Sequence, residues 1–118
     1  MKDYPLILAY HRVRPEGGDS ITNTPSQIRR HIWLLKLLGY RFTTLADWFG
    51  QRHRNNGRNV ILTFDDGWRD NFEHAFPVLR DADVGATIFL ISNYIGKETM
   101  PEGMSVADDR VFLSIEQI

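Results

Sequence analysis

Residues 60–67 read VILTFDDG, an apolar run followed by two adjacent aspartates and a glycine. The apolar run predicts a buried strand over residues 59–64. Gly67 lets the chain turn directly afterwards, so that Asp65 and Asp66 are both presented at the end of the strand. Two neighbouring carboxylates repel each other and are costly to desolvate, and a bound cation would offset the repulsion. The stretch therefore predicts a site in which one aspartate ligates a metal and the other acts on water; the alternative is a pair of turn-forming and helix-capping aspartates.

The rest of the chain alternates between strand and helix patterns. Strands are expected over residues 4–10, 59–64 and 86–91, and helices over residues 25–38 and 70–82, with a short helix from Thr44 through Phe49. This order predicts an α/β fold with parallel strands, in which active sites lie at the carboxyl ends of the strands. No repeat or linker interrupts the chain, so residues 1–118 are expected to form a single domain.

Both longer helices carry local signals. Thr24 and Gln27 form a capping box around Pro25. The first helix is expected to bury an apolar stripe made of Ile28, Ile32, Leu35 and Leu38. The second is expected to bury a face made of Phe72, Phe76 and Leu79, with a kink at Pro77. A polar loop is expected over residues 51–59 (QRHRNNGRN).

Charge and composition exclude several classes of partner. The 14 Lys and Arg residues against 15 Asp and Glu residues leave a net charge of -1, so no global field draws the protein to nucleic acid or to an anionic membrane. The chain has no cysteine, which excludes disulfides and thiolate metal sites. No segment has the length of a signal peptide core or a membrane span. As written the sequence predicts neither export nor anchoring, and the compartment stays open.

His11 is a further candidate for the site. It follows the strand expected over residues 4–10, at the same sheet edge as Asp65 and Asp66. A histidine there is suited to carry a proton near neutral pH. The alternative is a buried histidine that bonds to the backbone. The other histidines, His31, His53 and His74, have no ligand-type spacing to a partner.

Four segments together resemble the polysaccharide deacetylase (NodB-homology, carbohydrate esterase) family over nearly the whole chain. They are YHRV at 10–13, TFDDG at 63–67, ATIFLI at 86–91 and FLSIEQI at 112–118. The YHRV element is similar to that of the branch that deacetylates poly-N-acetylglucosamine-like polymers. The resemblance implies the N-terminal part of a distorted (β/α) barrel, incomplete in this chain, which ends within a helix started by a capping box at Ser114 and Gln117.

The resemblance also implies a function, the metal-dependent hydrolysis of the acetamide of N-acetylated sugars in a polysaccharide. Asp65 matches the general base, Asp66 a ligand of a divalent metal, usually zinc, and His11 the catalytic acid. Trp68, where the family commonly has tyrosine, and Tyr94 are candidates for stacking on a sugar ring. The family is often extracytoplasmic. Its zinc-binding histidine pair normally follows the helix at Ser114, so this fragment is expected to bind zinc weakly or not at all and to be inactive.

Two other functions remain open. One is a non-catalytic glycan-binding or assembly module with a deacetylase-like fold. The other is a magnesium phosphotransfer or phosphatase enzyme, although no glycine-rich phosphate loop and no lysine near Asp65 support it. Three to four strand-helix units are too few to close a barrel. Self-association through an open sheet edge is therefore expected.

Overall fold

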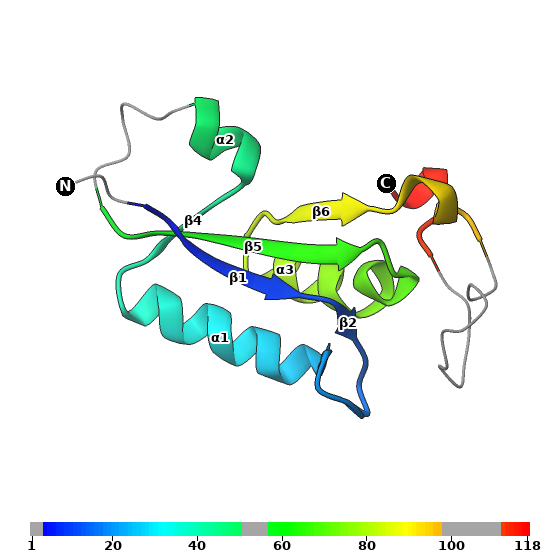
Figure 1. The fold of residues 1–118 in the computed structure, drawn as a ribbon. Helices are drawn as coiled ribbons and strands as arrows, with labels where there is room; N and C mark the ends of the chain where they lie inside the picture. Colours follow the sequence, from blue (N-terminus) through cyan, green and yellow to red (C-terminus); the bar gives the residue numbers. More distant parts are fainter. Residues whose placement is uncertain (1–3, 51–56, 98–111) are drawn as a thin grey trace.

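The computed structural model describes residues 4–50, 57–97 and 112–118 (Figure 1). The strands are β1 (Leu6–Tyr10), β2 (Arg12–Val13), β3 (Thr22–Asn23), β4 (Arg41–Thr43), β5 (Asn59–Asp66) and β6 (Thr87–Leu90). The helices are α1 (Pro25–Leu37), α2 (Leu45–Gly50) and α3 (Phe76–Asp81), with a π-helical turn η1 (Asn71–Ala75) and two 3₁₀ turns, η2 (Ser92–Tyr94) and η3 (Ile115–Gln117). This order confirms the expected alternation of strands and helices. No helix in the described part of the chain has the length and apolar character needed to cross a bilayer.

β5 is the central strand of a parallel sheet. β1 pairs with one edge of β5, from Leu6 opposite Val60 to Tyr10 opposite Phe64. On the other edge, β4 pairs with the first residues of β5 and β6 pairs with the last residues. The two short strands therefore lie end to end along the same edge of β5. Because all the pairings are parallel, the carboxyl ends of β1, β5 and β6 lie at one edge of the sheet (Figure 1). The α/β class is confirmed, and the sheet stays open among the described residues, as an incomplete barrel requires.

One face of the sheet carries the hydrophobic core. Residues 59–64 of β5 are all buried, which confirms the buried strand expected there. The core cluster joins β1 and β5 to both longer helices and consists of Tyr10, Val13, Ile28, Ile32, Leu35, Val60, Leu62, Phe64, Ala75, Val78, Leu79 and Val84. Tyr10 stacks on Phe64 with 5.3 Å between ring centroids. This contact anchors β1 to β5 just before the sheet edge at which the aspartates lie.

The two capped helices begin as expected. Thr24 accepts a hydrogen bond from the Gln27 backbone N–H, and the Gln27 side chain accepts one from the Thr24 N–H, so the capping box of α1 is formed. Thr44 caps α2 by accepting a bond from the Asp47 N–H at 3.1 Å. Leu38 was wrongly assigned to the buried stripe. It is the C-cap of α1 and about half exposed, because the helix has ended before it can face the sheet.

The helix expected over residues 70–82 is divided into η1 and α3, and its buried face differs from the expected one. Leu79 is buried as expected, but Phe72 and Phe76 are 41% and 47% exposed and stack on each other. Asn71, Ala75 and Val78 are buried instead. Pro77 has no N–H to donate to the preceding turn, and the Phe76 N–H bonds to the Asn71 carbonyl in a π-type register. The wider turn rotates the buried face away from the one that a regular helical period predicts.

Two further differences concern the strands. β5 extends to Asp66, two residues beyond the expected end, because Asp65 and Asp66 pair with Phe89 and Leu90 of β6. The short parallel pair of β2 and β3 was not expected; Arg12 lies opposite Thr22 in it. Most of the polar loop expected over residues 51–59, with His53, lies outside the described residues. At the other end of the chain, the capping box of Ser114 and Gln117 is formed at η3.

Candidate active site

The register of β1 on β5 brings His11 and Asp65 together. Tyr10 is paired with Phe64, so the next residue along each strand reaches the carboxyl edge of the sheet at the same level. The Nε2 atom of His11 lies 3.4 Å from Oδ2 of Asp65. The two side chains are 38% and 35% exposed, so solvent and a ligand can reach them. A histidine and a carboxylate in this arrangement form an acid–base pair at the edge where α/β proteins place their active sites.

Asp66 differs from Asp65 in backbone conformation and in partner. Its φ of 76° places it in the left-handed region, and Gly67 follows with a φ of 69°. Two such residues in succession turn the chain sharply out of the strand. The carboxylate of Asp66 accepts a hydrogen bond from the Trp68 indole Nε1 at 3.3 Å, rather than bonding to His11. The two aspartates thus have separate surroundings, which suits two separate roles.

Gly67 is favoured by its φ of 69°, a conformation that side chains rarely adopt. A Cβ atom at this position would also lie 2.7 Å from Cδ2 of Leu90 on β6, so the end of the Leu90 side chain would have to shift. A second, independent contact closes the turn from the other side, because the Gly67 carbonyl accepts a bond from the Leu113 N–H at 2.8 Å.

Trp68 supports the site from the core. Its side chain is only 3% exposed; it stacks on Phe112 at 4.8 Å between centroids, and the Arg12 guanidinium lies 4.4 Å from the ring centroid. This burial disagrees with the expectation that the Trp68 ring stacks on a sugar, since the residues around the turn already cover it. Tyr94, which is half-buried and also contacts Phe112, remains the aromatic candidate near the site.

Three further residues surround the site and were not expected there from the sequence: Arg12, Asp70 and Asn71. Asp70 accepts hydrogen bonds from Arg12 Nε at 2.9 Å and from the Val13 N–H at 3.1 Å, and Asn71 Nδ2 donates to the His11 carbonyl at 2.9 Å. Burial raises the pKa of Asp70, an effect that the bonds from Val13 and Arg12 oppose. In the sequence, Asp70 and Asn71 indicate only the start of a helix. The one signal for Arg12 is its position next to His11.

The described residues offer few donors for a metal ion. Asp66 and Asp65 offer carboxylate oxygens at the sheet edge, but no group of three or more His, Cys, Asp or Glu side chains able to hold a metal occurs within 4–50, 57–97 and 112–118. A catalytic zinc site uses about three protein ligands. The described donors therefore do not by themselves fit zinc, and an oxygen-only pair suits a hydrated Mg²⁺ or Ca²⁺ better.

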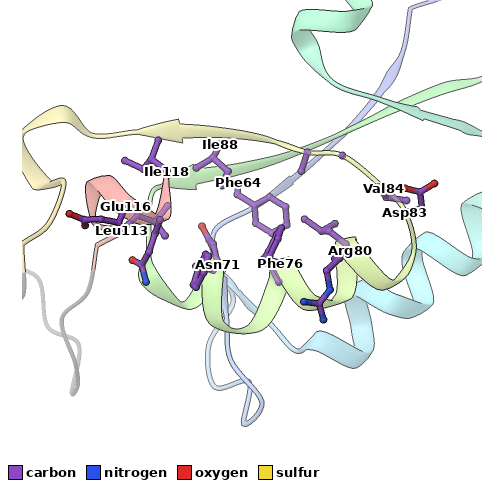
Figure 2. A pocket seen from close by; sticks show the side chains of 16 residues that line it. Phe64, Asn71, Phe76, Arg80, Asp83, Val84, Ile88, Leu113, Glu116 and Ile118 are labelled. Carbon is purple, nitrogen blue, oxygen red and sulfur yellow. The ribbon is translucent and has the colours of Figure 1, made fainter.

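A groove next to this site is lined by Asn71 but by neither aspartate. It has a volume of about 630 Å³ and runs between α3 and β6, with Phe76 and Ile88 facing across it and Ile118 at one end (Figure 2). None of His11, Asp65 and Asp66 lines it. The groove therefore belongs to the helix-covered side of the sheet and not to the edge with the acid–base pair.

The structure is a parallel α/β sheet that stays open among the described residues. Its carboxyl edge carries an accessible histidine–carboxylate pair and a second carboxylate. A family model described as polysaccharide deacetylase matches residues 52–111, about half of the chain. The chain belongs to the polysaccharide deacetylase family.

Individual relatives agree with this assignment. The chain is 32% identical over 111 residues to the poly-beta-1,6-N-acetyl-D-glucosamine N-deacetylase of Staphylococcus epidermidis, covering 80% of this chain and 38% of that protein. The structure of IcaB from Ammonifex degensii superposes with a TM-score of 0.76 at 30% identity, covering 96% of this chain and 46% of that one. A de-N-acetylase from Aggregatibacter actinomycetemcomitans, at 19% identity and a TM-score of 0.77 over 96% of this chain and 48% of that one, shows the same fold. The chain thus spans between a third and a half of the length of these relatives.

Proposed function

We propose that the chain carries the base, the acid and one metal ligand of a deacetylase that acts on N-acetylated polysaccharides. The contact of His11 with Asp65, 3.4 Å apart at the accessible carboxyl edge of the sheet, is the observation that carries this proposal. The family assignment supplies the class of reaction. The poly-beta-1,6-N-acetyl-D-glucosamine N-deacetylase of Staphylococcus epidermidis suggests a polymer of N-acetylglucosamine as the substrate.

In the proposed reaction, Asp65 removes a proton from a water molecule as its oxygen attacks the acetamide carbonyl carbon. The carbon–nitrogen bond then breaks, and His11 donates a proton to the departing nitrogen, leaving acetate and a free amino group on the sugar. Asp66 is the proposed metal ligand, and a divalent metal, zinc in the family, would stabilise the negative charge that develops on the carbonyl oxygen. Because the described donors do not complete a zinc site, we expect the 118-residue chain to bind zinc weakly and to show no turnover.

The test compares acetate release by two proteins, using poly-N-acetylglucosamine and chitooligosaccharides. The first is the 118-residue chain with added zinc. The second is a chimera in which the chain replaces the matching part of IcaB from Ammonifex degensii, chosen because the two backbones superpose over 96% of this chain. We expect the chimera to release acetate, and the Asp65→Asn or His11→Ala variant to lower the rate by about 100-fold or more, as the loss of a general base or acid does.

Asp81→Asn is the matched control, since Asp81 is an exposed carboxylate on α3 whose partner is the neighbouring Arg80. It should leave the rate unchanged. Full activity of the Asp65→Asn chimera would remove Asp65 as the base. Sugar binding that neither a chelator nor Asp66→Ala weakens, without acetate release, would instead favour a glycan-binding module.

A further inference from the structure

The segment that follows β5 holds the backbone around His11 by side-chain hydrogen bonds. Asn71 donates to the His11 carbonyl at 2.9 Å, and Asp70 accepts from Arg12 Nε and from the Val13 N–H. Asn71 Nδ2 also donates to Asp70 Oδ1 at 3.2 Å, so the two side chains act as a unit. Three consecutive residues, 11 to 13, are thus bonded to two consecutive residues that lie about sixty positions later in the chain.

These bonds connect residues 11–13 to the end of β5, the strand that carries the aspartates. The backbone N–H groups of Arg12 and Arg14 bond to β3 and the residue before it, at the carbonyls of Ile21 and Asn23. Asp70 and Asn71, by contrast, follow directly on the turn after β5. Their side chains therefore determine where the residues after β1 lie relative to the end of β5.

Stability alone does not explain the network. Arg12, Asp70 and Asn71 are all buried, and among the described residues Arg12 Nη1 and Asn71 Oδ1 have no hydrogen-bond partner. An unpaired buried polar group costs about 1–3 kcal/mol, and apolar residues of similar volume often replace a buried ion pair without loss of stability. An arrangement of this kind is better explained by the geometry that it imposes.

We infer that Asn71, supported by Asp70, is a positioning residue that holds His11 within reach of Asp65. The inference rests on the proposed function in taking His11 as the acid. Asn71 acts directly on the His11 main chain, because its Nδ2 donates to the His11 carbonyl. Loss of the donor frees the His11 main chain to rotate and so lengthens the distance from Nε2 to Oδ2 of Asp65.

The test is an NMR measurement on the 118-residue chain that requires no activity. The ¹⁵N chemical shifts of the His11 ring report which nitrogen carries the proton. The measurement is made at alkaline pH, where the two ring nitrogens of a neutral imidazole have different ¹⁵N shifts. A contact between Nε2–H and the Asp65 carboxylate then favours the tautomer protonated at Nε2. The Asp65→Asn variant gives the reference shifts for a weakened contact.

We expect Asn71→Leu, which keeps the volume and removes the donor, to move the His11 shifts most of the way to those of Asp65→Asn. Asn59→Leu is the matched control: Asn59 is 4% exposed against 3% for Asn71, and it too donates to a backbone carbonyl, that of Gly57, at the other end of β5. The shifts of His31, whose Nδ1 lies 2.9 Å from the Tyr10 hydroxyl, should not change in either variant. If the leucine variant does not fold, Asn71→Ala removes the same donor without filling the space.

His11 shifts that stay at the wild-type values in a folded Asn71 variant would overturn the inference, as would an equal change in Asn59→Leu. The acetate-release assay separates this result from the proposed function. If the His11 shifts move but the Asn71→Leu chimera keeps its rate, the positioning role stands and His11 is not the acid. If the shifts move and kcat falls with little change in KM, both stand.

Discussion

Asp66 has a left-handed backbone conformation, so a glycine variant at this position should be more stable than an alanine variant, the reverse of the usual order of stability. Asp66 has a φ of 76°, a conformation in which a Cβ atom costs about 1–2 kcal/mol. Glycine avoids this cost, but its greater freedom in the unfolded chain costs about 0.4–1 kcal/mol relative to alanine. Asp66→Gly should therefore be more stable than Asp66→Ala, by roughly 0.5–1.5 kcal/mol in the free energy of unfolding.

Asp65 provides the matched control, one residue earlier in the same strand. It is paired with Phe89 of β6 and does not have a positive φ. In a strand glycine is less stable than alanine by about 0.5–1 kcal/mol, so Asp65→Ala should be more stable than Asp65→Gly. Within each pair, both variants lose the same carboxylate and its contacts. The comparison of alanine with glycine therefore isolates the backbone at each position.

Urea denaturation of the four variants measures the effect directly, with the slope m checked for constancy. A difference of 1 kcal/mol also corresponds to a shift of about 4 °C in Tm for a domain of this size. The order should reverse between the two positions. If alanine is as stable as glycine or more stable at position 66, Asp66 is not held in the left-handed region, and the separation of the two carboxylates into different surroundings would lose its structural basis.

Two further predictions concern the core and the sheet edge. Burial raises the pKa of Tyr10 from 10.0 to about 12. The stability contributed by its neutral phenol is therefore complete below about pH 10 and is lost as the pH rises through about 12. Denaturation across this pH range should show the loss of stability in the wild type and not in Tyr10→Phe. We also propose that the chain self-associates through an open sheet edge or an exposed face. In the described residues, β1 and β6 each pair only with β5. The side chains of Ile7 and Phe89 are also about half exposed. Light scattering should show association that Ile7→Lys reduces, and a monodisperse monomer at high concentration would contradict the proposal.

Local signals predicted most of the elements because the decisive interactions are close in sequence. The capping boxes at Thr24 and Ser114 each involve a residue three positions later, and the buried run of β5 is a continuous apolar stretch. The failures have a different origin. The buried face after Asp70 could not be predicted from a helical period, because Pro77 and the π-type turn change that period.

The proximity of His11 to Asp65 was predictable from the sequence, and the contacts that support the two residues were not. Parallel strands bring their carboxyl ends to one edge, so His11 and the aspartates were expected near each other. Trp68 was misassigned because nothing in its neighbours along the chain shows that Phe112 would cover it. Its burial depends on a segment that returns to the turn from more than forty residues away.

The contact between His11 and Asp65 depends on register, and register is what the sequence pattern specifies least. A shift of one residue between β1 and β5 would place Tyr10 on the opposite face and separate the two side chains. The pairing of Tyr10 with Phe64 is stabilised by the stacked rings below the edge, and Asn71 and Asp70 hold the backbone above it. The contact between His11 and Asp65 is therefore supported from both sides. Because its two supports are far apart in sequence and of different chemistry, a substitution in either one should disturb the pair without changing a residue of the pair itself.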